Sequence, residues 1–187
     1  ASIASSERDE AIVSALQAFA ARATADQMYL SCAVIFSDSD SHSEAWFEDK
    51  LWARLRAFHE LDITQHEWDP TVSADPEDPA FSFSLGGKAF YVVGLHPRAS
   101  RLGRRFSRPV LVFNLHNQFE NLRASGTYDK FRKTILARDE KLNGTPNPML
   151  KTHGEASEAI QYSGRQITGE WKCPFHALHA RKDDHGH

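Results

Sequence analysis

The sequence predicts an α+β domain in which a small antiparallel or mixed sheet, with a central hairpin, is flanked by several helices. Three observations lead to this fold class. Apolar residues recur at helical spacing near both ends of the chain, two β-rich runs flank a Gly-Gly pair, and the apolar run "VLVF" follows them. The hairpin and the strand at 109–115 follow one another without a helix between them, and this order favours α+β with an antiparallel or mixed sheet.

Two amphipathic helices and one strand are predicted in the first third of the chain. Residues 6–23 carry Ile12 and Leu16 at helical spacing, behind capping serines and an acidic first turn. Residues 43–60 repeat large apolar side chains at the same spacing. Between the two helices, "YLSCAVIF" at residues 29–36 is short and apolar, which predicts a buried strand.

The middle and the end of the chain predict a hairpin, a strand and two more helices. Residues 81–96 read as a hairpin around the Gly-Gly turn, and residues 109–115 as a fully buried strand. A short helix is expected at 118–126, and a longer one at 128–142 with its apolar residues on one face. Residues 154–178 mix glycine, serine and charge with apolar residues and are expected to be irregular.

Length and composition predict a single domain, residues 1–187, in a reducing compartment. The chain has 187 residues, 41% of them hydrophobic, and a net charge of -3, which disfavours a nucleic-acid-coating protein. Its two cysteines, Cys32 and Cys173, are too few for a disulfide scaffold, so we expect a cytoplasmic protein. No signal peptide or membrane-length apolar run is apparent. Residues 1–5 and 177–187 are expected to be flexible.

A cluster of arginines between His96 and His116 is the most unusual feature of the sequence. Its members are Arg98, Arg101, Arg104, Arg105 and Arg108. Guanidinium groups bind carboxylates and phosphates in a bidentate manner, and the cluster lies between two strand ends, where ligand sites tend to form. The alternative is a solvated basic loop that pairs with nearby acidic residues.

Several other side chains in the same region could bind a cofactor or a substrate. His96 ends a strand before a proline, and His116 follows a buried strand and begins a helix; either alone could be a hydrogen-bonded core histidine. Cys173, before Pro-Phe, could be a buried structural thiol or a thiolate ligand. Glu120 could favour a helix N-terminus or bind a cation. Together with many aromatic residues, this set fits a flat, anionic, largely apolar cofactor such as a porphyrin.

Five motifs in order resemble the YqcI/YcgG family. They are "FSFSLGGKAFYVVGLHPRASRLGRRF", "VLVFNLHNQFENLR", "NPML", "GEASEAIQYSGR" and "WKCPF", and the resemblance runs from Trp68 to Phe175. Members of that family act as heme-dependent N-hydroxylases of guanidino groups in D-cycloserine and guanitoxin biosynthesis. The resemblance therefore implies a b-type heme and monooxygenation of a guanidino or amine nitrogen, using dioxygen and electrons or peroxide.

On this interpretation, His96 is the expected iron ligand, with His116 and then Cys173 as alternatives. The residues expected to bind the cofactor are His96, His116, Arg101, Arg104, Arg105, Arg165 and Cys173, with Arg101, Arg104 and Arg105 on the propionates. A cationic guanidino substrate needs carboxylates, and those available are Glu120, Glu155 and Glu158, with Gln118 beside the reacting oxygen. The implied partners are this small cationic substrate, dioxygen and an unknown electron donor, with a possible homodimer and neither nucleic acid nor membrane.

Two other functions fit the same residues. A heme-binding sensor or carrier without turnover would share the arginines and the histidine but would need no pocket for a cationic substrate. A heme-free binding module would need neither the ligand nor the arginines.

Overall fold

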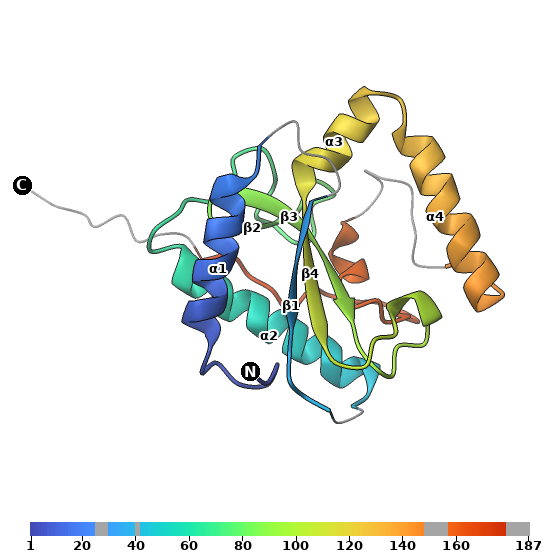
Figure 1. The fold of residues 1–187 in the computed structure, drawn as a ribbon, viewed down its shortest axis with the longest axis horizontal. Helices are drawn as coiled ribbons and strands as arrows, with labels where there is room; N and C mark the ends of the chain where they lie inside the picture. Colours follow the sequence, from blue (N-terminus) through green and yellow to red (C-terminus); the bar gives the residue numbers. More distant parts are fainter. Residues whose placement is uncertain (25–29, 40–41, 148–156, 179–187) are drawn as a thin grey trace, which may run out of the picture.

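A four-stranded antiparallel sheet forms the centre of the computed structural model, which describes residues 1–24, 30–39, 42–147 and 157–178 (Figure 1). The strands lie in the order β1-β4-β3-β2, so β1 and β2 are the edges. Their bounds are β1 Ser31–Ile35, β2 Phe83–Leu85, β3 Lys88–Leu95 and β4 Val110–Leu115. The α+β class, the antiparallel sheet and the central hairpin are therefore confirmed.

Two helices, α1 (Asp9–Arg22) and α2 (Glu44–Asp62), pack on one face of this sheet. Phe19 of α1 contacts Phe90 of β3, with ring centroids 6.1 Å apart. On the same face, a Cβ at Gly94 would lie 2.7 Å from the ring of Phe47 in α2, so only glycine permits this close approach. Within the described ranges, no helix is both long and apolar enough to cross a membrane.

The hairpin turn is fastened to α2. Gly86 and Gly87 have φ values of +61° and +66°, which suit glycine and match a turn with two left-handed central residues. The backbone N–H of Gly86 donates to both carboxylate oxygens of Asp62, at 3.0 and 2.9 Å. The last turn of α2 therefore fixes the turn between β2 and β3.

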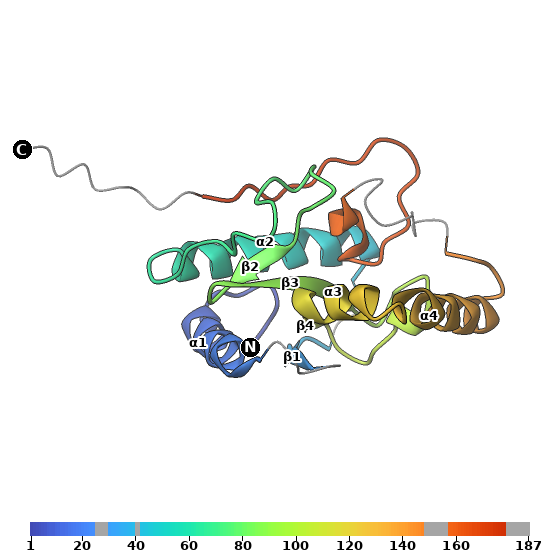
Figure 2. The same ribbon diagram turned by 90° about the horizontal axis from the view of Figure 1, so that it is seen from above.

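The second face of the sheet is only partly covered. Val112 and Asn114 of β4 are partly exposed, so the prediction of a fully buried strand is wrong on this face. Ile35, on the edge strand β1, is 57% exposed. In Figure 2, α3 (His116–Ala124) and α4 (Tyr128–Asn143) extend to one side of the sheet, away from α1.

The helices α3 and α4 follow β4 and extend away from α1 and α2 (Figures 1 and 2). None of the residues of α4, all of which the structure describes, is buried, and Ile135 on its predicted apolar face is 47% exposed. The helix lies against α3 and against a short 3-10 helix, η1 (Leu102–Arg104), that the sequence did not predict. The apolar face of α4 thus borders a cavity instead of the core.

Near the N-terminus, inside the segment 1–5 that was expected to be flexible, Ile3 is fully buried and its N–H donates to the carboxylate of Asp38 at 2.7 Å. The flexibility of this segment stays a prediction. After a second 3-10 helix, η2 (Glu158–Gln161), the chain runs back across α2. There Tyr162 stacks on Trp52 with centroids 5.5 Å apart. Residues 179–187 lie outside the described residues.

Candidate functional site

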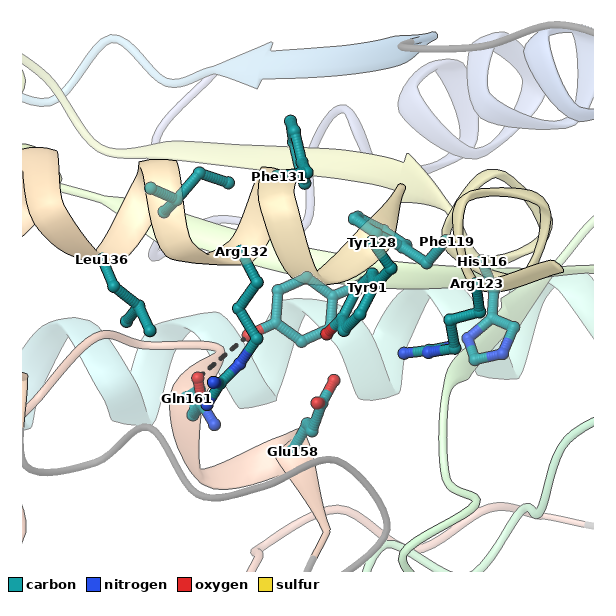
Figure 3. Close-up of a pocket in the computed structure, with 11 residues that line it drawn as sticks. Tyr91, His116, Phe119, Arg123, Tyr128, Phe131, Arg132, Leu136, Glu158 and Gln161 are labelled. Atoms are coloured by element: carbon teal, nitrogen blue, oxygen red, sulfur yellow. Dashed lines mark hydrogen bonds between the residues drawn. The ribbon is translucent and has the colours of Figure 1, made fainter. Parts of the chain in front are cut away.

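Two adjoining cavities open where β4 passes into α3. The first, here the aromatic cavity, is lined from β3, α3, α4 and η2 and has a volume of about 140 Å³ (Figure 3). Its walls carry the aromatic residues Tyr91, Phe119, Tyr128 and Phe131 and the guanidinium groups of Arg123 and Arg132. An apolar wall with a few convergent charged groups is typical of a ligand site.

The second, here the acidic cavity, lies between the loop before β2 and the start of α3. It has a volume of about 550 Å³, and Asp78, Glu120 and Glu158 contribute carboxylates to its wall. His116 and Glu158 line both cavities. The two hollows therefore share an imidazole and a carboxylate, while one is rich in aromatic rings and arginine and the other is rich in acid.

His116 is held by contacts on both ring nitrogens. It is the first residue of α3, directly after β4, so the end of a sheet strand fixes its backbone. Its Nδ1 lies 2.8 Å from the hydroxyl of Ser82, and its Nε2 lies 3.3 Å from Oε1 of Glu120. Glu120 in turn pairs with Arg123, three residues further along α3. The ring therefore has a fixed orientation at the junction of the two cavities.

His96 lies at the other end of the sheet. Because β3 and β4 are antiparallel, and Leu95 pairs with Val110, the residues that follow these two strands leave at opposite ends. Five residue steps along β4 correspond to about 17 Å. His96 is 2% exposed and stacks on Phe47 with centroids 4.4 Å apart. Burial lowers its pKa, and its Nε2 has no hydrogen-bond partner among the described residues.

The three arginines expected on propionates contact protein groups. Arg101 is 4% exposed, forms an ion pair with Asp139 of α4 and donates to the carbonyls of Thr145 and Pro146. Arg104 donates to the carbonyl oxygens of Gly94, at 3.1 Å, and Gln161, at 3.0 Å. Arg105 donates through Nε to the carbonyl of Ala99 at 2.7 Å. These contacts place the cluster in the scaffold around η1, and none of the three lines either cavity.

The remaining predicted residues are divided between the cavities and the core. Arg165 pairs with Glu48 of α2 at 2.6 Å, and Gln118 is buried with its amide donating to the carbonyl of Leu30 at 3.3 Å. Cys173 is buried, and burial raises the pKa of its thiol to about 12, which disfavours a thiolate. Glu120 and Glu158 do lie at the site, whereas Glu155 falls outside the described residues.

Several residues at the site were missed by reasoning from the sequence. Ser82 is one of the alternating polar residues of the hairpin motif, and nothing local sets it apart from Ser84. Arg123 follows Glu120 by three residues, a spacing that does predict an ion pair on a helix. The wall contributed by Arg132 and Tyr128 could be recognised only once α4 was placed beside η2, because the two segments are distant in sequence.

The donor set of the aromatic cavity fits a heme. A heme needs a protein side chain on its iron, apolar walls for its faces and cations for its propionates. His116 offers an imidazole, four aromatic rings supply the walls, and Arg123 and Arg132 supply positive charge. In the part of the chain that the structure describes, no group of three or more histidine, cysteine or acidic side chains could hold a metal ion directly.

A sequence-family model described as the YqcI/YcgG family matches residues 1–176. The chain belongs to the YqcI/YcgG family. The match reaches further towards the N-terminus than the motifs found in the sequence, which begin at Trp68, so α1, β1 and α2 are also part of the family pattern. Both cavities lie within the matched residues. No curated protein and no solved structure matches the chain.

Proposed function

We propose that this chain is a heme-dependent monooxygenase that N-hydroxylates a guanidino or amine nitrogen. The heme would occupy the aromatic cavity, with His116 as its iron ligand. The observation that carries the proposal is the position of this imidazole, on the wall shared by an aromatic, arginine-lined cavity and an acidic one. The motifs that resemble heme-dependent N-hydroxylases include His116 and Glu158, which line both cavities.

Among the histidines of the arginine region, His116 suits the ligand role better than His96. The ring of His96 is packed on Phe47 in the core, and it lines neither cavity. A porphyrin there would have to displace the contact between α2 and β3, where even a Cβ at Gly94 has no room. His116, in contrast, is 22% exposed and borders open space on two sides.

The side chains of the aromatic cavity would bind the cofactor. When bound, the heme would supply the redox chemistry that activates dioxygen or peroxide. Arg123 and Arg132 would pair with the propionates through charge-assisted hydrogen bonds, and the rings of Tyr91, Phe119 and Tyr128 would pack on its faces and exclude water. In Figure 3 the side chain of Arg132 extends from α4 towards the space that Glu158 faces from η2.

The carboxylates of the acidic cavity would attract a cationic substrate. Asp78 and Glu158 come from different segments and line the same space. A guanidinium group donates two parallel hydrogen bonds to a carboxylate, and its long-range attraction to an acidic wall raises the local concentration of the substrate. A neutral isostere of either side chain would lose that attraction.

Hemin titration with two histidine variants tests the proposal. Wild-type protein is expected to take up one hemin with a Soret shift, His116→Ala to lose it, and added imidazole to restore it. His96→Ala serves as the matched control, since it should keep the wild-type spectrum if it still folds. The ferrous carbon-monoxide spectrum should be that of an imidazole ligand. The assignment fails if His116→Ala keeps the wild-type spectrum.

Turnover decides between an oxygenase and the heme sensor or carrier. The reconstituted protein would be incubated with arginine or simple guanidines, a reductant and air, and the products analysed by mass for the addition of one oxygen atom. Stable heme binding without any such product would support the carrier.

We also place the protein in the cytoplasm, since both cysteines are free thiols.

A further inference from the structure

A part-buried contact between Ser82 and His116 connects two segments that are distant in the chain. Ser82 directly precedes β2, is 2% exposed and lines the acidic cavity, and its hydroxyl lies 2.8 Å from Nδ1 of His116. The backbone at Ser82 is held next to the sheet, because the neighbouring N–H of Phe83 donates to the hydroxyl of Tyr162 at 3.2 Å. The serine is therefore a fixed partner for the imidazole.

The two ring nitrogens of a neutral histidine have opposite roles, so the contacts of one determine the state of the other. If Nε2 carries the proton, it can donate to Glu120, 3.3 Å away, while Nδ1 accepts from Ser82. If Nδ1 carries the proton, it donates to the hydroxyl of Ser82 and Nε2 presents a lone pair. In the first state Nε2 donates to the carboxylate of Glu120, and only in the second can Nε2 bind a metal.

We propose that Ser82 is a positioning residue that holds the ring of His116 for metal binding. When Nε2 binds the iron, the hydroxyl of Ser82 accepts a hydrogen bond from Nδ1–H and fixes the orientation of the ring. The change moves one proton from Nε2 to Nδ1, so the imidazole stays neutral and no proton is gained or lost. Glu120 then gives up its contact with Nε2 and keeps its ion pair with Arg123. This inference rests on the proposed function, in which His116 binds the heme iron.

The role of Ser82 resembles that of other partners of metal-bound histidines, which orient the ring and increase its basicity, and whose loss costs about 10- to 100-fold in metal affinity. Ser82→Ala keeps the shape of the site and removes only the acceptor. We therefore expect hemin to dissociate at least about tenfold faster from this variant. The iron–imidazole stretching band of the ferrous protein should move to lower frequency, because a ring without an acceptor on Nδ1 donates less electron density.

Two variants separate this role from a general effect on the fold. Ser82→Thr keeps the hydroxyl and should restore both the band and the dissociation rate. Ser84→Ala is the matched control: Ser84 is equally buried, at 2% exposed, but its hydroxyl accepts from the N–H of Asp69 and does not contact the histidine. This control should lower the unfolding temperature without moving the band.

The outcomes distinguish this inference from the proposed function. If His116→Ala loses hemin while Ser82→Ala has the wild-type band and dissociation rate, the role of Ser82 is overturned and the heme site stands. If His116→Ala binds hemin as the wild type does, the proposed site itself is overturned, and the role of Ser82 with it. A shifted band in Ser82→Ala that Ser82→Thr reverses supports the inference.

Discussion

At the scale of single residues, the arginine cluster stabilises the fold by binding carbonyl groups. The chain leaves β3 after Leu95 and must return to begin β4 at Val110, and the backbone between them has few partners in the sheet. Arg104 donates to the carbonyls of Gly94 and Gln161, so a single guanidinium joins β3 to η2. Buried carbonyls without such donors would cost free energy. In this slightly acidic protein, the positive charge of the cluster therefore stabilises the loop between β3 and β4.

Arg101→Ala is expected to destabilise the fold strongly. Its guanidinium is 4% exposed and pairs with Asp139, and removal of one partner of a buried ion pair typically costs about 3–5 kcal/mol. Urea denaturation should show a loss of about 3 kcal/mol, and Asp139→Asn a loss of the same order. The double variant should lose less than the sum of the two. A change below about 1 kcal/mol for Arg101→Ala would show that the pair is not important for stability.

His96 is expected to make the protein less stable in mild acid. Burial lowers its pKa in the folded state below the ordinary value of 6.5, which is retained on unfolding. Above pH 6.5 both states are neutral and the group has no effect. Below it the unfolded chain binds a proton that the folded chain does not, so the free energy of unfolding falls as the pH falls, by at most about 1.4 kcal/mol per pH unit.

The measurement compares urea denaturation of the wild type and His96→Gln between pH 7.5 and 5. The other histidines contribute to both proteins, so the difference between the two curves isolates His96. The wild type should lose more stability than the variant over this range. Parallel curves would mean that His96 titrates alike in the folded and unfolded states.

At the scale of elements, one carboxylate of α2 fastens the segment that follows η2. Glu48 accepts from Ser163 at 3.1 Å, from Trp171 at 3.2 Å and from Arg165 at 2.6 Å. Three donors from three separate positions converge on this buried side chain. The same segment carries Tyr162, which stacks on α2 and bonds to the backbone of β3 at Phe90 and Gly94. Glu48 therefore supports η2, which forms one wall of the aromatic cavity.

Glu48→Gln should loosen this segment. The change removes the charge from three hydrogen bonds and replaces one acceptor by a donor, which we expect to cost about 2 kcal/mol. Limited trypsin digestion should then cut after Arg165 or Lys172 faster than in the wild type. Glu60→Gln, at an exposed position of the same helix, is the control and should change neither the digestion nor the stability. Equal digestion of all three proteins would contradict the role of Glu48.

At the scale of the whole molecule, the sequence was sufficient for the elements but insufficient for the site. The predicted helix at 43–60 matches α2, and the Gly-Gly turn lies where it was predicted, because periodicity and turn chemistry are local properties. The ligand role of Arg101 was inferred from its neighbours in the sequence, whereas its actual partner, Asp139, is 38 residues away. Long-range pairs of this kind are set by the packing of α4 against η1, which no local pattern shows.

The dependence on tertiary structure also explains why the sequence could not distinguish the roles of His96 and His116. Both stand at strand ends in the sequence, so they appear equivalent. They separate only when the antiparallel pairing of β3 and β4 sends one to each end of the sheet. The Gly-Gly turn does predict the direction of β3 relative to β2. The pairing of β4 with β3, rather than with β2, comes from the tertiary structure.

The arrangement of the whole molecule predicts a difference in local stability. The sheet, α1 and α2 share the core, whereas α4 contributes no buried residue and rests on α3 and η1. Amides of α4 should therefore exchange with deuterium much faster than those of α2, since exposed helices open locally at low free-energy cost.

A ligand that binds only the folded site stabilises the elements that line it. Hemin should slow exchange in α3, α4 and η2, which surround the aromatic cavity, and leave α1 unchanged. Hydrogen exchange followed by mass spectrometry on peptides of the wild type and His116→Ala, each with and without hemin, measures this directly. Protection that appears around His96 instead would place the ligand at the other end of the sheet, and protection that persists in His116→Ala would show that hemin binding does not depend on His116.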